Sequence, residues 1–193
     1  TDHSQSSVQA GGLSVEKLRK QRDAIDELRE RTKGIQILHG SEVDILTDGR
    51  LDYEDEVLAE LDIVVASPHA ALRQDTRTAT DRLIRAIENP FTRVLGHPTG
   101  RVIGRREGLD LAIDELIAAA RQHANWLRLD LRDTHVRAAV EAGCLIAINC
   151  DVHATADFDM LEYGVTTARR GWLTADQCVN TWTKAKLRKW LAR

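Results

Sequence analysis

The chain has 193 residues, of which 42% are hydrophobic and 30% charged, and its formal net charge is -3. This composition is typical of a soluble globular protein and excludes disordered and fibrous classes. A membrane-spanning class is also excluded, because no apolar run reaches the roughly 18 residues that a transmembrane helix needs. We expect a single domain over residues 1–193, located in the cytoplasm. The small net charge means that any nucleic-acid binding must be local or supplied by another domain.

Helices and strands are expected to alternate along the chain. The first helix covers residues 15–32, with Ser14 as its N-cap and Gly34 as its stop. A strand follows at residues 35–38, and residues 43–46 extend it beyond Gly40. The later strands are expected at residues 63–66, 93–95 and 144–149, and the later helices at residues 53–60, 76–87, 109–123, 135–142, 160–171 and 175–191. This alternation predicts an α/β fold with a parallel sheet or barrel.

Polar clusters that contain a histidine or a carboxylate follow these strands. The candidate metal ligands are His3, Glu42, His69, His97, Asp151 and His153. Because functional groups of parallel α/β folds collect at the carboxyl ends of the strands, we expect these side chains to meet. Imidazole and carboxylate groups suit Zn, Mn or Fe, and the lack of thiolates argues against a purely structural zinc site. Any one of these histidines alone would more often be structural, but their repetition at strand ends favours a metal site.

The same residues indicate phosphoester chemistry. Asp151 and His153 can converge, because side chains two residues apart in an extended segment share a face. Glu42 is placed to bridge two cations, and clustered cations bind phosphate oxygens and activate water. Arg101 could hold a phosphate. We therefore expect Glu42, Asp151 and Arg101 to be catalytic.

Other polar and aromatic groups are interpreted as structural. The three cysteines form no C-x-x-C pair and are expected to be reduced interior thiols: Cys144, Cys150 and Cys178. Three histidines that do not fit the pattern of ligands at strand ends are interpreted as structural: His39, His123 and His135. Two arginine pairs, at 105–106 and 169–170, are interpreted as solvated faces. Three tryptophans are interpreted as packing for the C-terminal helices rather than as a base-stacking platform: Trp172, Trp182 and Trp190.

Longer motifs link the chain to a known family. They are Thr-Asp-His-Ser at residues 1–4, Gly-Gly-Leu-Ser at 11–14, Glu-Val-Asp-Ile-Leu at 42–46, Val-Leu-Gly-His-Pro-Thr-Gly-Arg at 94–101, Arg-Leu-Asp-Leu at 128–131, Tyr-Gly-Val at 163–165 and Ala-Arg-Arg-Gly-Trp-Leu at 168–173. Through nearly its whole length the sequence resembles the PHP (polymerase and histidinol phosphatase) domain, in the version found at the C-terminus of bacterial family X DNA polymerases.

The resemblance implies a distorted (β/α)7 barrel whose rim holds up to three Mn or Zn ions. It implies hydrolysis of phosphoesters, including 3′-to-5′ removal of nucleotides from DNA, and in some members cleavage at abasic sites or of 3′-phosphates. The implied context is DNA repair near the bacterial nucleoid, with a polymerase module on the N-terminal side. Carried across by motif, the implied ligands are the same six residues, with Glu42 as the bridge.

Two departures from the family pattern stand out. The opening motif Asp-Leu-His-x-His is absent, so we expect an N-terminally truncated barrel without its first strand. Between His123 and Arg128 roughly one strand of four to eight residues is also missing. We therefore expect either a break in the barrel at that point or a stretch of chain absent from the numbered sequence.

Three functions follow as alternatives. The first is a metal-dependent phosphoesterase that acts on DNA ends. The second is a non-catalytic metal-binding or DNA-positioning module, which the missing motif favours. The third is a small-molecule phosphatase of the histidinol-phosphatase type, against which the polymerase-like C-terminal motifs argue.

Overall fold

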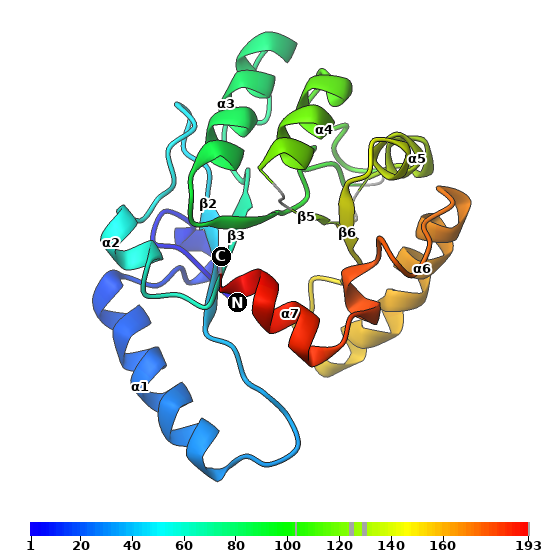
Figure 1. Cartoon of the computed structure of the whole chain (residues 1–193). Coiled ribbons are helices and arrows are strands. Elements are labelled where there is room, and N and C mark those ends of the chain that lie inside the picture. The colour runs from blue at the N-terminus through cyan, green and yellow to red at the C-terminus, as the bar shows by residue number, and fades with distance from the viewer. Residues whose placement is uncertain (103, 124–125, 129–130, 193) are drawn as a thin grey trace.

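A computed structural model describes residues 1–102, 104–123, 126–128 and 131–192, in which strands and helices alternate (Figure 1). The strands are β1 Asp2–His3, β2 Gly40–Asp44, β3 Ile63–Ser67, β4 Thr92–Leu95, β5 Trp126–Arg128 and β6 Leu145–Ala147. The α-helices are α1 Val15–Arg31, α2 Asp55–Leu58, α3 Thr76–Glu88, α4 Ile113–Gln122, α5 Asp133–Glu141, α6 Leu161–Arg170 and α7 Lys184–Leu191. Three short 3-10 helices complete the order: η1 Val8–Ala10, η2 Thr155–Met160 and η3 Val179–Thr181.

The strands form one parallel sheet in sequence order. Each strand pairs with its neighbour in the chain, from β1 to β6. The connections return the chain to the same end of the sheet each time, so all carboxyl ends lie along one edge. The α/β class and the parallel sheet are therefore confirmed.

The sheet curls round helix α7 (Figure 1). The ring of His153, six residues beyond β6, lies 6.4 Å between centroids from the ring of His3, which ends β1. Within the described backbone, β1 and β6 are not paired with each other. The strand order is thus compatible with a distorted barrel of the PHP type, and the described strands do not close it by hydrogen bonds.

Side chains alternate between the two faces of the curled sheet. On β3, Val64 and Ala66 belong to the main core beneath helices α1 to α5, whereas Ile63 and Val65 pack in a second cluster with Trp190 of α7. This period of two is the geometry of an extended strand. Helix α7 lies inside the ring formed by the other helices (Figure 1). The inner face is therefore closed by the C-terminal helix.

Most expected elements are confirmed, with boundaries shifted by a few residues. The exception near the N-terminus is the run 35–38, which is not a strand: β2 begins at Gly40. A Cβ at Gly40 would lie 2.5 Å from the Ile63 side chain, so the strand starts where the chain can approach β3 closely. The Ile35 side chain remains exposed.

Two further expectations are corrected. The single helix expected over residues 175–191 is divided into η3 and α7, because Thr183 caps α7 by accepting a hydrogen bond from the Lys186 backbone amide at 3.2 Å. The barrel break expected between His123 and Arg128 is corrected, because β5 pairs with both β4 and β6. The alternative, a stretch of chain absent from the numbered sequence, stays a prediction, and residues 124–125 lie outside the described residues. No helix in the described part of the chain has the length and apolar character needed to cross a membrane.

Candidate metal centre

Four of the six predicted ligands converge at the carboxyl edge of the sheet. His3 ends β1, Glu42 lies within β2, and His69 and His97 each follow their strands, β3 and β4, by two residues. The register places His3 directly opposite Glu42. The parallel sheet thus brings together side chains that lie up to 94 positions apart in the sequence.

The Glu42 carboxylate is the centre of this group. Its Oε1 lies 2.7 Å from Nε2 of His97 and 3.5 Å from Nε2 of His69. The Glu42 side chain is only 4% exposed. The ligand atoms of these three residues lie within 4.8 Å of one another. Two imidazoles that follow β3 and β4 and one carboxylate on β2 match the donor set of an open catalytic site for Zn or Mn.

His3 adds a third imidazole beside this group. Its ring lies edge-on to that of His69, with 4.9 Å between the centroids. Nδ1 of His3 is buried and has no hydrogen-bond partner among the described residues. Because buried polar atoms are nearly always satisfied, this nitrogen is suited to a ligand or an ordered water.

Asp44 is a site residue that the sequence analysis missed. Its buried carboxylate accepts hydrogen bonds from Ser6, from Ser7 Oγ at 2.9 Å and from Nδ1 of His69. Burial raises the pKa of Asp44, but these hydrogen bonds outweigh it and hold that pKa below the usual range. Asp44 can be grouped with His3 and His69 as a possible metal site. Its three existing donors make it better suited to orienting His69.

His69 is held between two carboxylates. Burial alone would lower its pKa, but hydrogen bonds from the ring to Asp44 and Glu42 raise the pKa to about 9. The ring is therefore protonated at neutral pH when no cation is bound. A cation on Nε2 would take the place of that proton, whereas Nδ1 stays on Asp44.

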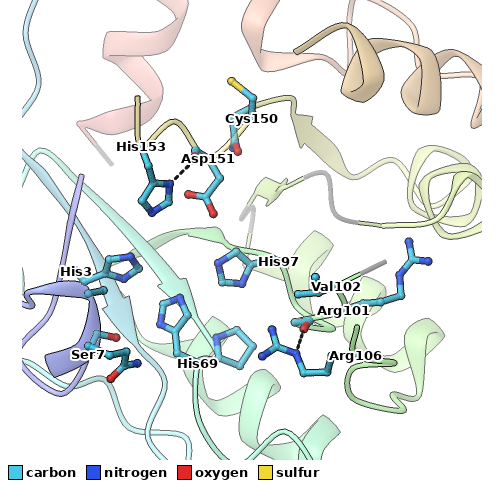
Figure 2. A pocket seen from close by; sticks show the side chains of 15 residues that line it. His3, Ser7, His69, His97, Arg101, Val102, Arg106, Cys150, Asp151 and His153 are labelled. Atoms are coloured by element: carbon cyan, nitrogen blue, oxygen red, sulfur yellow. Dashed lines mark hydrogen bonds between the residues drawn. The ribbon is translucent and has the colours of Figure 1, made fainter. Parts of the chain in front are cut away.

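The remaining two predicted ligands lie on the other wall of the same cavity, which has a volume of about 480 Å³. The Asp151 carboxylate and the His153 ring point towards His3 and His97 (Figure 2). Both residues are exposed, and Nδ1 of His153 contacts the backbone oxygen of Asp151 at 2.6 Å. Neither joins the close ligand groups found among the described residues. Asp151 has a positive φ of 52°, a sparsely populated conformation often found at functional sites.

The arginines near His97 differ from expectation in their directions. Arg101, the predicted phosphate ligand, lines the cavity, but its guanidinium points away from the histidines (Figure 2). Arg106 is exposed, as expected for a solvated face, but it also lines the same cavity with its guanidinium turned towards the histidines (Figure 2). Sequence spacing could not show this, because residues 102 and 106 pair in a small hairpin that sets both directions.

The groups interpreted as structural are mostly in structural positions. All three thiols are free, as predicted, although Cys150 is only half-buried and lines the cavity. Trp190 is buried, and Trp182 packs beside it. The interpretation of Trp172 is wrong: it is 65% exposed and stacks under the guanidinium of Arg137 at 3.7 Å.

The remaining three histidines lie outside the close ligand groups of the described residues. His39 is buried, with its Nε2 3.3 Å from the Gln21 side chain. His123 caps the end of α4, and His135 lies in α5.

Several known proteins are similar to this chain in sequence. No protein-family profile matches the chain. The "DNA polymerase/3′-5′ exonuclease PolX" of Bacillus subtilis is 44% identical over 187 residues, which are 93% of this chain and 33% of that protein. The chain resembles the PHP domain of family X DNA polymerases, as its motifs predicted.

Shorter relatives of this chain carry no polymerase in their names. A "probable phosphatase" of Thermoanaerobacter sp. (strain X514) is 27% identical over 171 residues, covering 80% of this chain and 67% of its own length. A "probable phosphatase" of Caldanaerobacter subterraneus is 30% identical over 105 residues, covering 52% of this chain and 39% of its own length. The chain spans about a third of the PolX relative and about two thirds of the first phosphatase.

Proposed function

We propose that this domain is a metal-dependent phosphoesterase that processes DNA ends, by 3′-to-5′ removal of nucleotides or of 3′-end groups. The observation that carries the proposal is the buried Glu42 carboxylate lying between Nε2 of His69 and Nε2 of His97, two residues that line the cavity. The name of the PolX relative supports DNA as the substrate, and the phosphatase names of the shorter relatives support phosphoester hydrolysis.

Each residue has a distinct task in this proposal. Glu42, His69 and His97 would hold a divalent cation, Mn²⁺ or Zn²⁺, and His3 with Asp151 and His153 would complete neighbouring positions for up to three ions. A bound cation supplies a water of lowered pKa and neutralises charge on the phosphate oxygens. Asp44 keeps His69 in one tautomer. Asp151, whose carboxylate points into the cavity (Figure 2), would accept the proton of the attacking water on the oxygen that is not bound to a cation.

The whole protein is proposed to carry a polymerase module. The chain spans only 33% of the PolX relative, so most of that relative lies outside the matched segment. The domain would then act on DNA ends that the polymerase module also binds, in repair at the nucleoid.

The experiment measures release of nucleotides from the 3′ end of single-stranded DNA, with and without Mn²⁺. Wild-type chain should release nucleotides only with the cation, and Glu42→Gln should abolish that release. Glu56→Gln, a change of an exposed carboxylate on α2, serves as the matched control and should behave as wild type.

Two other outcomes would replace the proposal. Hydrolysis of histidinol phosphate without DNA cleavage would assign the small-molecule phosphatase function, which the match to shorter phosphatases favours as the second candidate. Bound metal without turnover of either substrate would assign the non-catalytic module.

A further inference from the structure

The segment after His97 forms a small hairpin at the rim of the cavity. The backbone amide of Val102 donates to the oxygen of Arg106 at 2.9 Å, and the amide of Arg106 donates back to Val102 at 2.8 Å. Gly108 has a φ of +87°, and a Cβ there would lie 2.5 Å from the oxygen of Thr99. Only glycine fits this close approach, so the hairpin is tightly anchored at its base.

The hairpin directs the Arg106 side chain into the cavity. Its Nε donates to the backbone oxygen of Gly100 at 2.6 Å, and its guanidinium lies on the side of His69 and His97 (Figure 2). In the described ranges, no carboxylate forms a salt bridge with Arg106. The carbonyl contact fixes the plane of the group through Nε, and it leaves the two terminal nitrogens to face the cavity.

Three arginines of the segment can be compared as phosphate ligands. Arg101 lines the cavity, but its guanidinium is turned away from the histidines (Figure 2), and the residue also lines the neighbouring pocket with His135. Arg105 does not line the cavity that His69 and His97 line. Arg106 alone of these three combines position in the cavity with a guanidinium turned towards the candidate metal ligands.

We propose that Arg106 binds the scissile phosphate of the substrate, or the terminal phosphate of a 3′-phosphorylated end, opposite the cations held at Glu42. This inference rests on the proposed function. A guanidinium offers paired donors that match two phosphate oxygens, and its charge-assisted hydrogen bonds are stronger than neutral ones. Because the Gly100 carbonyl already orders the group, little further side-chain entropy is lost when phosphate binds.

The test uses the metal-loaded chain and two readouts. The first is binding of inorganic phosphate by calorimetry in Mn²⁺, and the second is the KM and kcat for nucleotide release from DNA. Arg106→Ala should weaken phosphate binding and raise KM by about 10- to 100-fold, the range for loss of charge-assisted hydrogen bonds. Arg105→Ala is the matched control and should stay within about threefold of wild type. Arg101→Ala tests the competing residue and should have a smaller effect than Arg106→Ala. Arg106→Lys should recover part of the loss.

The outcomes separate this inference from the function on which it rests. Equal behaviour of Arg106→Ala and Arg105→Ala in a chain that cleaves DNA would overturn the role of Arg106 and leave the proposed function intact. A larger effect of Arg101→Ala would do the same. If the wild type binds phosphate through Arg106 but cleaves nothing, the phosphate site stands and the proposed function fails. Absence of phosphate binding to the metal-loaded wild type would overturn the inference.

Discussion

Asp44 and His69 form a carboxylate–imidazole pair in which Nδ1 of the ring donates to Asp44. Nε2 of the same ring therefore faces Glu42, at 3.5 Å from its Oε1. Such outer carboxylates fix the tautomer of a metal-binding histidine and increase its basicity. The pair explains why a buried aspartate with three hydrogen-bond donors lies next to the candidate metal ligands.

We expect Asp44→Asn to weaken metal binding by about 10- to 100-fold, the usual effect of losing an outer-shell partner. The fold should persist, because the amide oxygen can still accept from Ser6 and Ser7. Titration with Mn²⁺, with circular dichroism as the check on folding, measures this. Asp48→Asn is the control, since Asp48 is an exposed carboxylate that pairs with Arg50. Equal Mn²⁺ affinities for the two variants would contradict the orienting role.

The pH dependence of stability should change sign when metal is added. In the metal-free protein the pKa of His69 is raised to about 9 from 6.5. A raised pKa stabilises the fold fully below about pH 6.5, and the contribution is lost as pH rises through about 9. A cation competes with that proton, so stabilisation by metal should instead grow with pH.

The measurement is thermal unfolding across this pH range, in EDTA and in Mn²⁺. With EDTA, the Tm of the wild type should fall towards high pH more steeply than that of His69→Gln. The gain in Tm from Mn²⁺ should increase over the same range. Parallel curves for the two proteins in EDTA would show that His69 does not carry the proton.

Gly96 allows His97 to reach the metal site. A Cβ at this position would lie 2.1 Å from Oγ of Ser67 and 3.0 Å from Cγ1 of Val65. We expect Gly96→Ala to destabilise the fold by about 1–3 kcal/mol, as overpacking does, and to displace His97. Denaturant unfolding and Mn²⁺ affinity should both register the change.

A double variant tests the cause of that effect. Oγ of Ser67 is buried without a hydrogen-bond partner in the described part of the chain, so Ser67→Ala alone should have little effect. Combined with Gly96→Ala it should recover part of the lost stability, with a coupling of about 1 kcal/mol. Strictly additive effects would mean that the contact with Ser67 is not the reason for glycine.

Substitution of Trp190 tests whether helix α7 packs against the inner face of the sheet as part of the core. Its side chain is 4% exposed and packs with Val94, Ala147 and Val179. Trp190→Ala should lower the free energy of unfolding by about 3–5 kcal/mol. The control Trp172→Ala, at a 65% exposed position, should cost no more than about 1 kcal/mol. Similar losses for both would show that α7 is not part of the core.

Much of the site could be predicted from sequence, because alternating strands and helices indicate which residues follow parallel strands. Apolar runs that end in His69 and His97 follow the pattern of parallel strands, whose carboxyl ends share one edge. Asp44 was missed even though Glu42-x-Asp44 has the same period of two that was applied to Asp151 and His153. The spacing on β2 therefore holds the signal for Asp44.

Other features depend on contacts that a sequence does not display. The guanidinium directions of Arg101 and Arg106 are set by backbone pairing of residues 102 and 106. The start of β2 depends on the approach of Gly40 to Ile63, and the 65% exposure of Trp172 follows no local sequence pattern. The curl of the sheet, which brings His153 to His3, is a property of all six strands together.

The most direct test of the account is anomalous diffraction from crystals grown with Mn²⁺. The account predicts a manganese peak bound by Oε1 of Glu42, Nε2 of His69 and Nε2 of His97, at ligand distances of about 2.0–2.2 Å. The peak should be lost in Glu42→Gln. Manganese bound elsewhere, or a peak that persists at this position without the Glu42 carboxylate, would contradict it.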